Sequence, residues 1–214
     1  MMSNKLSFIH RFEPATRLEA PPLLLLHGTG GDEDDLLQLG RLISPGSALL
    51  SPRGKVIENG MPRFFRRHAE GVFDEDDLRL RANELADFIE AARSAYGIGR
   101  PVAVGFSNGA NIAAAVLLLR PDALAGAILL RAMVPFALPP KADLSDKRIL
   151  MVSGEHDPII PRENAAHLAS LLSERGAQVE QHSLPIGHQL SQADLTLSRR
   201  WIDAFGANSL DKAS

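Results

Sequence analysis

A serine flanked by glycines is the residue of this chain best suited to act as a nucleophile. It is Ser107, within Gly-Phe-Ser-Asn-Gly at 105–109, and it follows the apolar run 102–104 and precedes small and apolar residues at 110–119. This order predicts a buried strand, a sharp strained turn that exposes the serine, and a helix. The glycines are expected because strand and helix pass too close for a Cβ atom. For the pentapeptide alone, a glycine-rich turn whose serine merely caps the helix is the alternative.

An aspartate and a histidine later in the chain fall where partners for this serine are needed. A serine hydroxyl is a weak nucleophile at neutral pH, so it requires a base to remove its proton and a carboxylate to orient the base. Asp157 closely follows the apolar run 148–153. His188 lies in a loop after the alternating segment 178–184, before the last helical pattern. The order serine, acid, histidine is typical of a nucleophile on a strand-to-helix turn, and it predicts Ser107, Asp157 and His188 as a catalytic triad.

Other residues compete for the acid and the base. Glu155 is the alternative to Asp157, and His156 is the alternative to His188, although His156 precedes the last predicted strand. The remaining histidines are less well placed: His10 and His68 precede the serine, His167 falls in a helical pattern and His182 in a strand pattern. No pair of histidines has metal-ligand spacing with carboxylates, so we expect no metal site.

Two backbone N–H groups are expected to stabilise the oxyanion that attack by a serine would create. One belongs to Asn108, directly after the serine, and the other to Thr29 in the glycine-rich loop 28–31. A phosphate-binding loop is the alternative for that loop, but it lacks the spacing of glycines and lysine, and the later acidic residue, that such sites need. His27 is expected to brace the loops rather than to react.

The composition limits the classes of function. With 214 residues, 45% of them hydrophobic, the chain can bury a substantial core, and we expect a single domain over residues 1–214. The formal net charge of −3 gives no electrostatic reason to expect nucleic acid or an anionic membrane as partner. The absence of cysteine excludes disulfides and thiolate chemistry. No apolar run has the length of a signal peptide or a membrane span, so a cytoplasmic location is the default expectation.

Strand and helix patterns alternate along the chain. Strands are expected at 6–12, 22–27, 47–52, 102–104, 125–130, 148–153 and 178–184, and helices at 32–42, 75–96, from 107 onward, 161–175 and 191–205, with an irregular segment at 53–74. This alternation predicts a doubly wound, mainly parallel α/β sheet flanked by helices. Ligands of such sheets bind beyond the carboxyl ends of the strands, which is where the polar segments described above fall.

Four ordered motifs resemble the carboxylesterase/phospholipase group of the α/β-hydrolases, which includes small bacterial carboxylesterases and acyl-protein thioesterases. The motifs are His-Gly-Thr-Gly-Gly-Asp at 27–32, Gly-Phe-Ser-Asn-Gly at 105–109, Gly-Glu-His-Asp-Pro-Ile-Ile-Pro at 154–161 and Gly-His at 187–188. The resemblance covers nearly the whole chain. It implies an α/β-hydrolase fold, the triad and oxyanion donors named above, no cofactor and often a homodimer. No insertion is long enough to form a separate cap domain.

Two departures favour the bacterial esterase branch of this group over the thioesterases. Thioesterase members usually carry His-Gly-x-Gly-Asp and Gly-Phe-Ser-Gln-Gly, whereas this chain has the additional Gly31 and has Asn108 in place of the glutamine. Because the oxyanion donor is a backbone group, the mechanism survives both changes. Dienelactone hydrolases are disfavoured, since they use a cysteine and this chain has none.

These observations predict a serine hydrolase that cleaves carboxylic esters of short to medium chain length through an acyl-enzyme. A lysophospholipase or an acyl thioesterase with the same triad is the nearest alternative. From a different class, a non-catalytic binding protein on a hydrolase scaffold is the third possibility, and the intact triad argues against it.

Apolar residues that follow two strand ends are expected to border the acyl site. They are Met61, Phe64, Phe65, Met133 and Phe136. The alternative is that these side chains fill core beneath a long loop. Three arginines of the same segment, Arg63, Arg66 and Arg67, are of a kind usually found on a solvated face, but they could receive a substrate carboxylate or phosphate.

Overall fold

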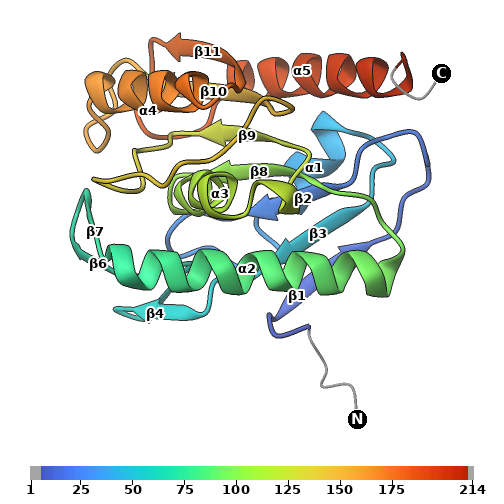
Figure 1. Ribbon diagram of the computed structural model, residues 1–214, viewed down its shortest axis with the longest axis horizontal. Helices are drawn as coiled ribbons and strands as arrows, with labels where there is room; N and C mark the ends of the chain where they lie inside the picture. The colour runs from blue at the N-terminus through green and yellow to red at the C-terminus, as the bar shows by residue number, and fades with distance from the viewer. Residues whose placement is uncertain (1–5, 212–214) are drawn as a thin grey trace.

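A seven-stranded sheet forms the centre of the protein, seen in a computed structural model that describes residues 6–211 (Figure 1). The spatial order of its strands is β1-β3-β2-β8-β9-β10-β11. Their bounds are His10–Glu13 for β1, Leu23–Leu26 for β2, Leu49–Pro52 for β3, Val102–Phe106 for β8, Gly126–Leu130 for β9, Arg148–Gly154 for β10 and Gln178–Leu184 for β11. β1 is antiparallel to β3, and the other neighbours are parallel. The predicted mainly parallel α/β sheet is confirmed.

The ends of the predicted domain, residues 1 and 214, lie outside the described residues. So do residues 1–5, which are part of the segment in which no signal peptide is expected.

Helices cover both faces of this sheet. They are α1 at Leu37–Ile43, α2 at Glu75–Tyr96, α3 at Asn108–Leu119, α4 at Arg162–Glu174 and α5 at Gln192–Asp211, with a short 3₁₀ helix, η1, at Pro121–Ala123. Apolar side chains of α2, α3 and α4 share one core with the sheet, and those of α1 and α5 share the other. In Figure 1, α2 and α3 lie on the side of the sheet nearest the viewer. No helix within residues 6–211 is both long enough and apolar enough to cross a membrane.

The run of four leucines that forms β2 shows why both faces must be covered. Leu24 and Leu26 point into the core beneath α2 and α3, whereas Leu23 and Leu25 point into the core beneath α1 and α5. All four side chains are fully buried. A strand buried on both faces is therefore continuously apolar, because alternate residues serve opposite cores.

The segment 53–74, expected to be irregular, instead contains two small hairpins. One pairs β4, Val56–Glu58, with β5, Met61–Arg63, and the other pairs β6, Arg67–Ala69, with β7, Val72–Phe73. Strands of two or three residues are too short to show an alternating pattern. The first hairpin did carry a turn signal, Asn-Gly at 59–60, and both residues adopt the positive φ that such a turn requires.

The first helix is also shorter than predicted. It begins at Leu37 rather than near residue 32, because the preceding acidic residues form turns in which Asp32 Oδ1 accepts a hydrogen bond from Asp34 N. A short aspartate side chain that binds a backbone N–H two residues on favours a turn over a helix. The loop that carries Thr29 is therefore longer than the sequence suggested.

Candidate active site

Ser107 occupies the strained turn between β8 and α3. Its backbone has φ 53° and ψ −113°, a left-handed conformation that is rare for a residue with a side chain. Ser107 N donates to Leu130 O at 2.9 Å, so the turn is held by the neighbouring strand β9. The two glycines are required as expected: a Cβ on Gly105 would lie 2.5 Å from Gly109 O, and one on Gly109 would lie 2.0 Å from Leu26 O.

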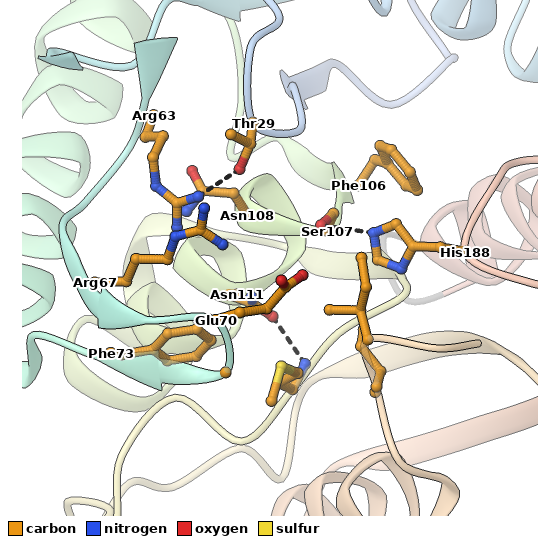
Figure 2. A pocket seen from close by; sticks show the side chains of 14 residues that line it. Thr29, Arg63, Arg67, Glu70, Phe73, Phe106, Ser107, Asn108, Asn111 and His188 are labelled. Atoms are coloured by element: carbon orange, nitrogen blue, oxygen red, sulfur yellow. Dashed lines mark hydrogen bonds between the residues drawn. The ribbon is translucent and has the colours of Figure 1, made fainter. Parts of the chain in front are cut away.

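His188 joins the serine to a buried carboxylate. Its Nε2 lies 2.9 Å from Ser107 Oγ, and its Nδ1 lies 2.8 Å from Asp157 Oδ2 (Figure 2 shows the first of these bonds). The side chain of Asp157 is fully buried, and that of His188 is 18% exposed. An ionised carboxylate only accepts hydrogen bonds, so Nδ1 carries the proton and Nε2 is left to accept the serine hydroxyl proton. The three groups predicted from sequence are thus brought together in order.

The second oxygen of Asp157 is held by the backbone of its own loop. Oδ1 accepts from Ile159 N at 2.8 Å and from Ile160 N at 3.1 Å. These bonds fix the orientation of the carboxylate. They leave Oδ2 free to face His188. The backbone of the Pro-Ile-Ile-Pro sequence after Asp157 therefore orients this carboxylate toward the histidine.

The competing acid and base lie outside this arrangement. Glu155 faces Arg162, with 3.5 Å between their charged atoms, and His156 is exposed. The Nε2 atom of His182 lies 2.7 Å from Glu180 Oε1. None of these residues is among the described residues that line the cavity at Ser107.

A buried ion pair, which the sequence did not reveal, holds the loop that carries His188. Arg131, directly after β9, makes two hydrogen bonds to Asp194 of α5, at 2.8 and 3.0 Å. The same guanidinium donates to Gly187 O at 3.2 Å and to Gln189 O at 2.9 Å, on either side of the histidine. Charge-assisted bonds of this kind are strong and directional. The feature of the sequence that could have indicated this role is Arg131 itself, a charged residue near the end of the otherwise apolar run 125–132.

The two residues expected to supply oxyanion N–H groups both line the cavity beside Ser107. Asn108 is the first residue of α3, where a backbone N–H has no acceptor within its own helix. Its side-chain Oδ1 accepts from Phe64 N at 2.8 Å. The Thr29 hydroxyl accepts from Arg63 Nη1 at 2.6 Å, so both segments are tied to the hairpin at residues 56–63 and the residues after it.

His27 braces the loop of Thr29 from below. Gly54 N donates to its Nε2 at 3.0 Å, which leaves Nδ1 to carry the proton and donate to Gly28 O at 2.7 Å. Burial lowers the pKa of His27, because a charged imidazole would lose its hydration there. A neutral side chain with both nitrogens engaged fits the bracing role expected for it.

A cavity of about 270 Å³ opens at Ser107 (Figure 2). Its wall combines polar groups with a few apolar ones, and the lining residues are Thr29, Arg63, Arg67, Glu70, Gly71, Phe73, Phe106, Ser107, Asn108, Asn111, Met133, Ile159, Ile160 and His188. A volume of this size is at the lower end of ligand pockets. The described cavity therefore fits a small substrate with at least one polar group.

Four of the five apolar residues predicted to border the site lie elsewhere. Met133 lines the cavity, but Phe64, Phe65 and Phe136 are at most 1% exposed and belong to the main core. Met61 is 39% exposed and contacts the loop at Gly30. The alternative, core beneath a loop, is correct for the three phenylalanines. The segment that joins the two hairpins buries Phe64 and Phe65, the segment after β9 buries Phe136, and Arg63 and Arg67 line the cavity instead.

Comparison with known proteins points to one family. Residues 74–148 match the family model described as alpha/beta hydrolase fold. The chain is 48% identical over 181 residues to a protein of Bacillus subtilis (strain 168) named as a hydrolase, MhqD, covering 84% of this chain and 90% of that one. It is 43% identical to the Bacillus cereus carboxylesterase, with a TM-score of 0.90 over 92% of this chain and 94% of the other. A carboxylesterase from Mesorhizobium loti is 29% identical, with a TM-score of 0.83 over 90% and 98% of the two chains.

Proposed function

This chain belongs to the carboxylesterase-like group of the α/β-hydrolases, and we propose that it is a serine hydrolase that cleaves carboxylic esters through an acyl-enzyme. The observation that carries the proposal is the continuous hydrogen-bonded path from Ser107 through His188 to Asp157. The strained backbone of Ser107 supports it, because strain of this kind is kept where it presents a reactive side chain.

In the proposed reaction, Ser107 Oγ attacks the acyl carbon while His188 Nε2 removes the hydroxyl proton. Asp157 stabilises the imidazolium that forms, and the N–H groups of Asn108 and Thr29 stabilise the tetrahedral oxyanion. The C–O bond to the alcohol then breaks, and the imidazolium returns its proton to the departing oxygen. A water molecule, deprotonated by His188, attacks the acyl-enzyme and releases the acid, which regenerates the serine.

The size of the cavity supports a preference for short to medium acyl chains. Its apolar part is formed by a few side chains, among them Phe73, Met133, Ile159 and Ile160. Each buried methylene contributes about 0.8 kcal/mol, so selectivity rises only as far as this apolar wall extends. A lysophospholipase or long-chain thioesterase needs a longer apolar surface, which makes the short-chain esterase the better-supported function.

A direct test uses a fluorophosphonate probe, which reacts covalently with activated serines. The wild-type protein should be labelled at Ser107 and should hydrolyse simple esters, while Ser107→Ala should do neither and should keep the wild-type circular dichroism spectrum. An unlabelled wild-type protein with no turnover over a panel of esters, thioesters and lysophospholipids would favour the non-catalytic binding protein.

Three properties of the whole molecule also remain proposals: a single domain over residues 1–214, a homodimer and a cytoplasmic location. Limited proteolysis should yield no stable fragment smaller than the domain. Light scattering should give twice the chain mass of 23.1 kDa. Fractionation of the source cells should recover the protein with cytoplasmic markers.

A further inference from the structure

Two arginines face the same cavity as the candidate nucleophile. Arg63 and Arg67, named here the arginine wall, line it together with Ser107 and His188. Figure 2 shows their guanidinium groups side by side, across the cavity from His188. The Arg63 side chain is only 3% exposed and that of Arg67 is 25% exposed. The two arginines are therefore buried and partly buried cations that line the cavity, not members of a solvated face.

One carboxylate serves both arginines. Glu58 Oε2 lies 3.2 Å from Arg63 Nε, and Glu58 Oε1 accepts from Arg67 Nε at 2.9 Å. Burial lowers the pKa of Arg63, and the neighbouring charge of Arg67 lowers it further. Glu58 is the one carboxylate among the described residues that pairs directly with these two positive charges, while Glu70 acts on Arg63 only through its charge, without an ion pair.

The outer nitrogens of Arg67 are available to a ligand. Nε is occupied by Glu58, and among the described residues no acceptor engages either Nη group. Arg63 differs, since its Nε donates to Phe65 O and its Nη1 to Thr29 Oγ1. Arg63 is thus fixed by the protein and can supply charge, whereas Arg67 can also supply hydrogen bonds.

Two further groups indicate the kind of ligand. Asn108 is 2% exposed and lines the cavity, and its Nδ2 is a buried donor without an acceptor among the described residues. Glu70 is exposed, lines the cavity and forms no ion pair among the described residues. The unused donors that can reach a ligand are therefore the Nη groups of Arg67, with Asn108 Nδ2 as an unpaired donor buried behind the cavity surface. The charge of Glu70 opposes a ligand with more than one negative charge.

We propose that the arginine wall binds a carboxylate on the substrate, at a distance from the ester that is cleaved, so that the preferred substrates are monoesters of short dicarboxylic acids. This inference rests on the proposed esterase function and names its substrate class. A guanidinium and a carboxylate match in planar geometry and can share two hydrogen bonds. In a partly closed cavity their attraction is screened less than at an open surface.

The test compares matched substrates that differ by one carboxylate. Monoethyl succinate, monoethyl glutarate and monoethyl adipate are compared with ethyl butanoate, ethyl pentanoate and ethyl hexanoate by titrating the acid released. At low ionic strength, kcat/KM of at least one monoester should exceed that of its neutral partner by roughly tenfold. Equal or slower hydrolysis of all three monoesters, or a preference for esters that carry an amino group, would overturn the inference.

Three variants locate the effect. Arg67→Gln should lower the ratio of monoester to neutral ester by roughly tenfold, and Glu70→Gln should raise it about two- to threefold. Arg66→Gln is the matched control: Arg66 is 61% exposed, pairs with Asp74 and Asp77, and does not line the cavity. It should leave the ratio unchanged. If Arg66→Gln lowered the ratio as much as Arg67→Gln, the preference for monoesters would arise from the overall charge of the protein surface, and the binding site at Arg67 would be refuted.

The failure of this inference is distinguishable from failure of the esterase proposal. Fluorophosphonate labelling and turnover of the neutral esters report on the serine chemistry alone. Labelling and neutral-ester turnover without a monoester preference would refute the carboxylate site and leave the esterase function intact. A wild-type protein that shows neither labelling nor any turnover would refute both the esterase proposal and the carboxylate site.

Discussion

Arg131 and Asp194 lie 63 residues apart in sequence and form a two-bond ion pair in which neither side chain is more than 2% exposed. The same guanidinium also donates to Gly187 O and Gln189 O, on either side of His188, and to Val152 O. Asp194 also accepts from the N–H and hydroxyl groups of Ser191 at the start of α5. The pair thereby fixes both ends of the segment that presents the proposed base.

Asp194→Asn is expected to destabilise the protein by about 3–5 kcal/mol, because it leaves the Arg131 charge buried without a partner. It should also lower kcat more than it raises KM, since the His188 loop loses its anchor. Urea unfolding and ester kinetics measure the two effects. Asp203→Asn, an exposed change on the same helix, is the control and should alter neither.

Replacement of the proposed base gives a second prediction. His188→Ala should lower kcat by roughly 10⁴- to 10⁶-fold with little change in KM, because no other group can take the serine proton. His156→Ala should retain nearly full activity, since that side chain is exposed and lies outside the cavity. The reverse result, with His156→Ala inactive and His188→Ala active, would assign the base to His156.

The buried, neutral His27 predicts a dependence of stability on pH. Because burial lowers its pKa in the folded state, the unfolded chain binds more protons at this site once pH falls below the ordinary histidine value of about 6.5. The stability that neutral His27 contributes is therefore fully present above about pH 6.5. It is lost as the pH falls toward the lowered pKa that His27 has in the folded state.

The measurement is the free energy of unfolding in urea between about pH 5 and pH 7. His27→Gln, which keeps a side-chain acceptor, should reduce the slope of this free energy by up to about 1.4 kcal/mol per pH unit. His68→Gln removes an exposed histidine and should leave the slope as it is. Parallel slopes for wild type and His27→Gln would contradict the assignment of His27 as a neutral brace.

The close approach of α3 to β2 predicts that Gly109→Ala is severely destabilising. The added Cβ would lie 2.0 Å from Leu26 O, a backbone atom that cannot swing away. The expected loss is about 3 kcal/mol or more, at the upper end of overpacking effects. Gly99→Ala, where nothing lies within 4 Å, should change stability by less than about 1 kcal/mol in the same urea experiment.

Acyl-chain selectivity is the fifth prediction. In a p-nitrophenyl ester series, kcat/KM should rise over roughly two to eight carbons and then level off, as the short apolar wall around Met133 and Ile160 is exhausted. A steady rise to about sixteen carbons would instead favour the lysophospholipase or thioesterase. Replacing Met133 with alanine should shift the optimum toward longer chains.

Much of the fold follows from local patterns in the sequence. The bounds predicted for α2, 75–96, are those observed, because a good cap at Asp74 and a glycine with positive φ at Gly97 define its ends. The turn at Ser107 was equally readable, since Gly105 and Gly109 are each required by a specific backbone contact. These features depend on neighbours in sequence, so one sequence suffices to predict them.

What could not be predicted depends on distant partners. Arg131 is fully buried, against the tendency of its residue type, and only Asp194 explains this. Arg63 is the last residue of β5, and Phe64 follows it directly. Which of the two side chains faces the cavity depends on the register of this hairpin, whose strands have three residues each, because a shift of one residue turns each side chain to the opposite face. The composition of the cavity wall was for this reason misjudged as apolar.

The end of β9 has a mechanical consequence. Leu130 O accepts a hydrogen bond from the backbone N–H of Ser107. The next residue, Arg131, donates hydrogen bonds to the loop that carries His188. Two reacting groups that are 81 residues apart in the chain are thus anchored by the last residue of β9 and by the residue that follows it. A displacement of this end of the sheet should therefore move Ser107 and His188 together and preserve the 2.9 Å separation between Ser107 Oγ and His188 Nε2.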